Sequence, residues 1–126
     1  MSNERVLAAV GGSLAFLSVA AGAFGAHALR SRLGPELLVT FETAARYQMY
    51  HALAALLAAL AYGRWAGHQA IWAGWAFVIG TAIFSGSLYL LTLTGARWWG
   101  AVTPIGGVTL LAGWVLFVWG VLAGNR

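Results

Sequence analysis

The segment FETAARYQMYHAL, residues 41–53, places a group of polar side chains directly before a run of alanine and leucine. Glu42 and Arg46 are four residues apart with the acid first, which is the favourable order for an ion pair within a helix. Four further polar residues follow directly: Tyr47, Gln48, Tyr50 and His51. Polar groups in apolar surroundings are costly to leave unpaired, so these side chains are the first candidates for a functional site.

Helical periodicity gathers most of these side chains on one face. At about 100° per residue, one half of the helix circumference holds Glu42, Thr43, Arg46, Tyr47, Tyr50 and His51, and Gln48 stands off it. We expect this face to avoid lipid. A later apolar segment repeats polar residues at intervals of four, four and three: Thr81, Ser85, Tyr89 and Thr92, with Ser87 nearby. His27 closes the first apolar segment.

Two interpretations of these residues stay open. In the first they line a polar cavity, with His51 as proton carrier or ligand, the tyrosines as donors, and Glu42 and Arg46 as a charge gate at its mouth. In the second they form an interhelical hydrogen-bond network with an ion pair at the membrane surface, each bond contributing about 0.6 to 2 kcal/mol.

Several kinds of chemistry find no support in the residue types. The chain has no cysteine, which excludes disulfides, thiolate metal sites and cysteine nucleophiles. Ser85-Gly86-Ser87 lacks the nucleophile elbow, and no aspartate is present to orient a histidine. The histidines lack metal-site spacing, and His68 is expected in a solvated loop. A haem held by His27 and His51 is disfavoured because the two lie at different depths. We therefore expect no metal, no cofactor and no enzymatic activity.

The composition indicates lipid as the solvent. Of 126 residues, 61% are hydrophobic and only 8% charged, with a mean hydropathy of +0.80, whereas soluble domains carry about 25% charged residues. The net charge of +4 comes from scattered arginines, unlike the clustered basic face of nucleic-acid binders. The predicted partner is the lipid bilayer, and no nucleic acid is expected.

The apolar segments predict an all-α integral membrane four-helix bundle with short loops, in a single domain over residues 1–126. Four segments approach the roughly 20 residues that cross a bilayer: 6–28, 44–62, 70–93 and 104–123. Gly34-Pro35-Glu36 is a helix-start signal, so the second helix is expected to begin in the interface, before its span. Thr103 and Pro104 are expected as the cap and first residue of the fourth helix.

Small residues are expected to mark helix interfaces, because close backbone approach holds membrane helices together. The predicted packing positions are Gly11, Ala15, Ser18, Gly22, Gly86, Gly106, Gly113 and Gly120. Three smooth faces among four helices would leave one without an internal partner, which suggests a homo-oligomer or other membrane subunits. Six tryptophans cluster near span ends, whereas Trp114 lies mid-span and its indole N–H needs a partner.

The first apolar segment is expected to be an uncleaved helix, although Ala26-His27-Ala28 has the form of a signal-peptidase site. Four spans place both termini on one side. That side holds Arg5, Arg64 and Arg126, and the other holds Arg30, Arg32, Arg97 and Arg46. The pair Arg30 and Arg32, directly after the first span, favours a cytoplasmic first loop and external termini.

Four motifs in this order resemble a known family. They are GAFGAHAL (22–29), YQMYHAL (47–53), FSGSLYLLTLTG (84–95) and TPIGG (103–107) followed by Gly113-Trp114. Together they are similar to the small bacterial membrane family of domain of unknown function 423, related to transmembrane protein 256-like proteins. The resemblance implies an integral protein of the bacterial inner membrane and supplies no activity. Its motif positions coincide with the polar residues singled out above.

The function expected from these observations is a non-enzymatic structural, assembly or accessory component of the membrane. Two alternatives stay open. One is a small oligomeric transporter or channel that uses the polar faces of the second and third helices. The other is an intramembrane cofactor binder or enzyme that uses His27 and His51.

Overall fold

The computed structural model describes residues 1–124, and within them all regular secondary structure is helical, as the predicted all-α class requires. Residue Arg126, used above for orientation, lies outside the described residues. The first helical rod, 27 residues long, consists of α1 (Asn3–Val19), a π-helical turn η1 (Ala20–Gly25) and α2 (Ala26–Leu29). The other rods are α3 (Pro35–Arg64), α4 (His68–Thr94) and a last rod in which the 3₁₀ helix η2 (Arg97–Ala101) leads into α5 (Thr103–Ala123).

Helix boundaries follow local chemistry. α3 begins at Pro35 behind the extended residue Gly34, as the start signal predicts, with Glu36 in its first turn. α4 ends at Gly95, whose φ of 73° is left-handed, a conformation that glycine adopts at little cost. Two boundaries differ from the prediction: His68 opens α4 instead of lying in a loop, and Thr103 makes no capping bond because the chain is already helical from Arg97.

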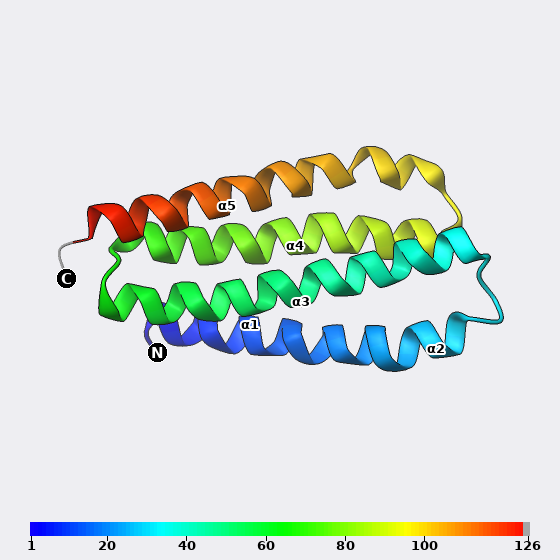
Figure 1. Cartoon of the computed structure of the whole chain (residues 1–126), viewed down its shortest axis with the longest axis horizontal. Helices are drawn as coiled ribbons and strands as arrows, with labels where there is room; N and C mark the ends of the chain where they lie inside the picture. Colours follow the sequence, from blue (N-terminus) through cyan, green and yellow to red (C-terminus); the bar gives the residue numbers. More distant parts are fainter. Residues whose placement is uncertain (125–126) are drawn as a thin grey trace.

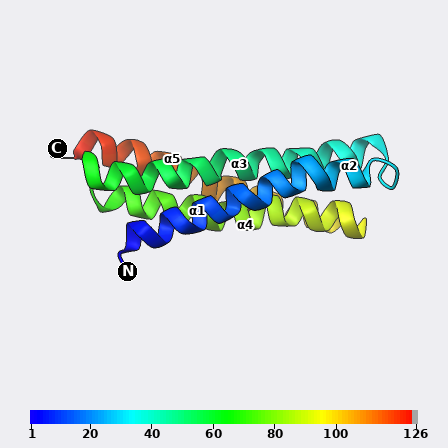
Figure 2. The same ribbon diagram turned by 90° about the horizontal axis from the view of Figure 1, so that it is seen from below.

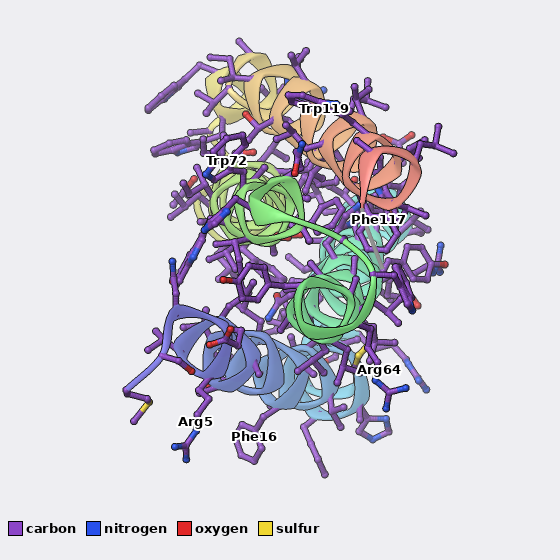
Figure 3. The ribbon with its side chains drawn as sticks, turned by 90° about the vertical axis from the view of Figure 1, so that its left-hand side faces the viewer. Arg5, Phe16, Arg64, Trp72, Phe117 and Trp119 are labelled. Atoms are coloured by element: carbon purple, nitrogen blue, oxygen red, sulfur yellow. The ribbon has the colours of Figure 1, made fainter. Side chains whose placement is uncertain are left out.

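The rods run antiparallel, side by side (Figure 1). One end of the molecule, here the terminal end, holds the start of α1, the α3–α4 connection and the end of α5. The opposite, distal end holds the connections 30–34 and 95–96 (Figures 1 and 2). α3 and α4 form the centre, because α3 packs on α1 and α4, and α4 packs on α5. Within the described residues α1 and α5 do not contact each other, and end-on they lie on opposite sides of the α3–α4 pair (Figure 3).

The helices approach closely where small residues face bulky ones. A Cβ added to Gly11 would lie 3.0 Å from the Ala52 carbonyl oxygen of α3. On α5, Cβ atoms added to Gly106, Gly113 and Gly120 would meet α4 at 3.1 Å or less. The smooth face of α5 is therefore filled by α4, and that of α1 by α3.

Three predicted packing positions are looser than expected. Gly86 faces open space, since an added Cβ would meet nothing within 4 Å. A Cβ at Gly22 would meet only Ala45, at an ordinary 3.7 Å, and Ala15 is only partly buried. The smooth faces of α1 and α5 thus contact helices of the same chain at several glycines, whereas a part of α4 around Gly86 is uncovered.

Three of the four rods are long and apolar enough to cross a membrane: Asn3–Leu29, His68–Thr94 and Arg97–Ala123. α3 is the longest helix, with 30 residues, yet its composition falls short. The reason is its first half, which carries Glu42, Arg46, Gln48 and His51. Whether α3 can cross the membrane therefore depends on which groups bond to these polar side chains and cover them.

Candidate functional site

Gln48 joins three helices. Its side chain is 5% exposed. Its Nε2 donates to the Leu14 carbonyl oxygen of α1 at 2.8 Å, and its Oε1 accepts from the Tyr89 hydroxyl of α4 at 2.6 Å. If the amide were flipped, its oxygen would lie against the Leu14 carbonyl oxygen, and two acceptors cannot bond. The two partners therefore fix the positions of Oε1 and Nε2. Gln48, predicted to stand off the polar face, thus bonds through its side chain to both α1 and α4.

His51 has both ring nitrogens engaged. Nδ1 lies 2.8 Å from the Tyr47 carbonyl oxygen, which can only accept, and the Trp114 indole N–H donates to Nε2 at 3.1 Å. These partners specify a neutral ring with the proton on Nδ1. The Trp114 bond also connects α3 to α5, helices that otherwise make few contacts. It supplies the partner that the mid-span indole was expected to need.

Two serines from opposite neighbours donate to adjacent carbonyls of α3. The Ser18 hydroxyl of α1 donates to Ala45 at 2.6 Å, and the Ser85 hydroxyl of α4 donates to Ala44 at 2.7 Å. We call Ala44, Ala45, Gln48 and His51 the α3 hub. Through hydrogen bonds alone, the hub ties α3 to each of the other three rods.

A second link joins α4 to the start of α5. The hydroxyls of Ser87 and Thr103 lie 2.6 Å apart. The expected helix cap is thus a partner for Ser87 instead. Thr92 bonds only within its own helix, to Tyr89 at 2.9 Å. Thr81 is the one buried side chain within residues 1–124 whose polar atom has no hydrogen-bond partner.

Aromatic rings cover the side of the hub that faces α5. Phe77 is fully buried, with its ring centroid 4.6 Å from that of Trp114 and 5.7 Å from that of His51. Tyr47 packs on Phe84 at 4.9 Å. Next to these rings lies an open hollow of about 490 Å³ between α3 and α5, lined almost entirely by apolar groups. Over the described chain, no group of three or more histidine and acidic side chains is placed to hold a metal ion.

Comparisons with known proteins identify the family. The profile of a family described as protein of unknown function (DUF423) matches residues 21–107. The UPF0382 membrane protein of Staphylococcus saprophyticus is 44% identical, over 92% of this chain and 96% of its own. The UPF0382 inner membrane protein YgdD of Escherichia coli is 43% identical, over 96% and 90%. The chain belongs to the DUF423 family. No solved structure matches it.

The resemblance drawn from the four motifs is therefore confirmed. The relatives are named as membrane proteins, and YgdD as an inner membrane protein. Together with three apolar helices of membrane-spanning length, these names identify the DUF423 chain as a multi-pass protein of the bacterial inner membrane.

Four of the predicted site residues of this DUF423 chain are exposed and form no hydrogen bond with the hub. His27, Glu42, Arg46 and Tyr50 are all exposed. Tyr47 also keeps 39% of its surface exposed and Tyr50 51%, so the face expected to avoid lipid is largely turned outward. Since His27 is exposed near the distal end and His51 is held by Trp114, they do not meet as a histidine pair.

The expected ion pair between Glu42 and Arg46 is not formed within the described residues. Both side chains instead line a hollow of about 230 Å³ between α3 and the π-helical turn, together with Ser18 and Gly22. The sequence pattern also missed the main-chain partners of the hub, because carbonyl oxygens carry no residue signature. Trp114 was the exception, since a lone indole mid-span indicates a buried partner.

Proposed function

We propose that the DUF423 chain is a four-span membrane bundle, with α3 as its second span. A 30-residue helix is about 45 Å long, which leaves its first turns in the headgroup region and the rest to cross about 30 Å of hydrocarbon. The hub supports this role for α3, because its polar groups are bonded and covered by other helices. A polar side chain that is bonded inside a bundle does not have to be solvated by lipid.

We further propose that the protein is a non-enzymatic structural, assembly or accessory component of the membrane. One observation carries this proposal: both ends of Gln48 and both nitrogens of His51 are engaged by other groups of the bundle. Groups engaged in this way hold helices together and are not presented to a substrate. A transporter or a histidine-ligated cofactor would require His51 to release Trp114.

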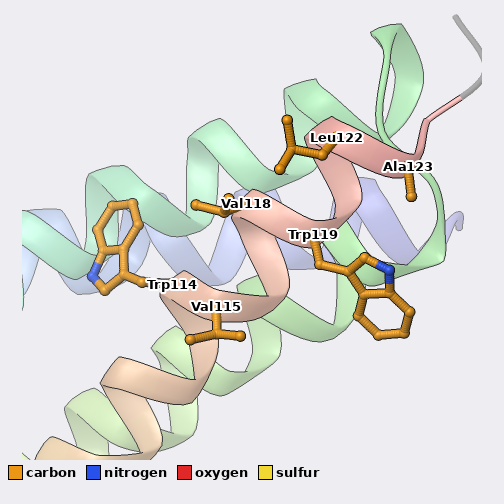
Figure 4. Close-up of a pocket in the computed structure, with 6 residues that line it drawn as sticks. All are labelled: Trp114, Val115, Val118, Trp119, Leu122 and Ala123. Carbon is orange, nitrogen blue, oxygen red and sulfur yellow. The ribbon is translucent and has the colours of Figure 1, made fainter.

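A partner surface fits the uncovered part of α4. Ala82 is exposed, and a Cβ on Gly86 would meet nothing within 4 Å, so this face is smooth and open to another membrane helix. The outer face of α5 differs, because bulky side chains project from it: Val115 and Val118 lie between Trp114 and Trp119, and Leu122 lies beyond Trp119 (Figure 4). Such an uneven apolar surface is suited to contact with lipid acyl chains. We propose the Ala82–Gly86 face for a second copy or another membrane subunit.

Site-directed photo-cross-linking in native membranes tests the proposal. A photoreactive residue at Ile79, 54% exposed beside Ala82, should give one defined protein adduct, identified by mass spectrometry. The matched control is Leu111, 67% exposed on the outer face of α5, where only lipid adducts are expected. A lone monomer at both positions, or equal protein adducts at both, would contradict a specific partner surface.

The proposal that the protein is not an enzyme is tested with variants of the hub. If the hub is structural, loss of cellular function in hub variants should follow their loss of thermal stability. A His51 variant that keeps wild-type stability and still abolishes function would instead favour a chemical role for the ring.

A further inference from the structure

The hollow between the π-helical turn and α3 carries two unpaired charges of opposite sign. Glu42 and Arg46 both line it, yet they form no ion pair within the described residues. Charged groups inside or beside a membrane span are expensive and normally have a partner. The bilayer itself is the nearest source of one.

The π-helical turn borders this hollow through Gly22. At Gly11 and Gly25, added Cβ atoms would approach α3 atoms to 3.0 and 3.1 Å, whereas at Gly22, inside the turn, the nearest atom is 3.7 Å away. The first rod therefore approaches α3 closely at Gly11 in α1 and at Gly25, the last residue of the turn, and less closely at Gly22 between them. π-helical turns inside α-helices occur frequently at functional sites.

The depth of the two charges fits a lipid headgroup. Along α3, Glu42 lies about 10 Å and Arg46 about 16 Å from the distal end at Pro35. Side chains of a helix lean toward its N-terminus, which for α3 is the distal end. The Arg46 guanidinium can therefore extend to the headgroup layer, with its stem along the apolar surface.

An apolar groove continues from the charged hollow toward the membrane centre. Met49 lines both, and the groove, about 420 Å³, is otherwise formed by α1 and the π-helical turn between Gly12 and Phe24, including Ala15, Phe16 and Val19. Along α3, from the distal end inward, the order is therefore Glu42, Arg46 and then Met49, where the apolar groove meets this helix. A zwitterionic phospholipid presents ammonium, phosphate and acyl chain in the same order.

We propose that this amphipathic groove binds one phospholipid with a primary-amine headgroup, phosphatidylethanolamine. Arg46 binds its phosphate, a geometry that guanidinium suits. The Glu42 carboxylate accepts a hydrogen bond from its ammonium group. The quaternary amine of phosphatidylcholine has no N–H to donate, and the glycerol headgroup of phosphatidylglycerol carries no positive charge. One acyl chain lies against Met49 and α1. This proposal is independent of the partner surface on α4, which lies on another helix.

Native mass spectrometry of the full-length protein tests the proposal after equilibration with equal amounts of phosphatidylethanolamine, phosphatidylglycerol and phosphatidylcholine. Wild type should retain phosphatidylethanolamine about tenfold over the others, the change expected for a charge-assisted hydrogen bond. Arg46→Gln should lower retention of all three lipids about tenfold, and Glu42→Gln should abolish only the preference for phosphatidylethanolamine.

Matched controls separate the groove from general charge. Arg32→Gln and Glu36→Gln remove the same charges at exposed positions near the same end, and both should behave as wild type. Thermal melts verify that every variant is folded. Equal retention in Arg46→Gln and Arg32→Gln, or an unchanged preference in Glu42→Gln, would overturn the proposal.

A soluble competitor distinguishes the lipid from its headgroup. Glycerophosphoethanolamine carries the same charges without acyl chains, and at equal concentration it should not displace the bound lipid. Displacement at equal concentration would show that the apolar groove contributes nothing, and the lipid form of the proposal would then be wrong.

Discussion

Residue type alone does not separate the two fates of polar side chains on α3. Gln48 and His51 point into the bundle and are 5% and 6% exposed, while Tyr50, between them in sequence, is 51% exposed. The difference is angular position relative to α1, α4 and α5. A buried amide must be bonded, whereas a tyrosine at the lipid surface can place its ring in hydrocarbon and its hydroxyl near water.

Replacing Gln48 by leucine should destabilise the bundle. The substitution removes the bonds to Leu14 and Tyr89 and leaves the Tyr89 hydroxyl without its partner. We expect a loss of about 1 to 2 kcal/mol in the free energy of unfolding, measured by denaturation in mixed micelles. Tyr89→Phe should lose less, since it removes one bond, and the double variant should show coupling of about 0.6 kcal/mol or more. Strict additivity would contradict the bond.

The His51 ring should carry its proton on Nδ1. The Tyr47 carbonyl can only accept and the Trp114 indole can only donate. Nitrogen NMR of the histidine side chain should therefore show a neutral Nδ1–H tautomer. Trp114→Phe, which keeps an aromatic ring and removes the donor, should change the Nε2 signal. A ring protonated on Nε2 in the wild type would contradict the arrangement.

At the scale of elements, contact between helices depends on which glycines face a neighbour. Gly106 and Gly107 are adjacent in α5 and indistinguishable by composition. An added Cβ on Gly106 would overlap the Phe84 backbone of α4, whereas on Gly107 the nearest atom is a Phe84 ring carbon at 3.9 Å. Similarly, Gly22 and Gly25 both lie in the π-helical turn, yet an added Cβ would meet the Phe41 ring at 3.1 Å on Gly25 and only Ala45, at 3.7 Å, on Gly22.

This pair of glycines gives a matched test of α4–α5 packing. Gly106→Ala should lower the free energy of unfolding by about 1 to 3 kcal/mol, the usual cost of overpacking. Gly107→Ala gains the same helix propensity as Gly106→Ala, and the added methyl group has open space around it, so this variant should be as stable as the wild type or slightly more stable. Denaturation in mixed micelles compares the two variants. Equal stability would mean that α5 is not held against Phe84.

At the scale of the whole molecule, the rods form an open stack. α1 and α5 flank the α3–α4 pair without meeting, so most of their outward surface is left to lipid. Large apolar residues are accordingly exposed on both, such as Phe16 at 73% and Leu122 at 81%, and Phe16 projects away from the bundle in Figure 3. The proposed four spans would place Asn3 and Ala123, the outer ends of the first and last rods, on one side of the membrane.

Thiol labelling tests the number of spans and their orientation. The chain contains no cysteine, so single Ser2→Cys and Arg32→Cys variants carry one thiol each. With external termini, a membrane-impermeant reagent should label Ser2→Cys in intact cells and Arg32→Cys only after lysis. Ala52→Cys, at a fully buried position, should stay unlabelled in both. Labelling of both terminal-end and distal-end thiols from outside would contradict four spans, and the reversed pattern would contradict only the orientation.

The sequence by itself determined the helical class, the family and most helix boundaries. Hydrophobic periodicity and signals such as Gly34-Pro35 act through nearby residues, so they can be read without a structure. It also singled out Gln48 and His51 of the hub and the side chains of Ser85, Tyr89 and Trp114 that bond to the hub, but not the main-chain partners. Only the tertiary structure decided that Gln48 is buried, that Gly86 is open and that Glu42 and Arg46 do not pair. The physical reason is that these outcomes depend on how each helix is rotated about its axis and how far it lies from its neighbours. They also depend on main-chain carbonyl acceptors, which every residue has and which therefore leave no mark in the sequence.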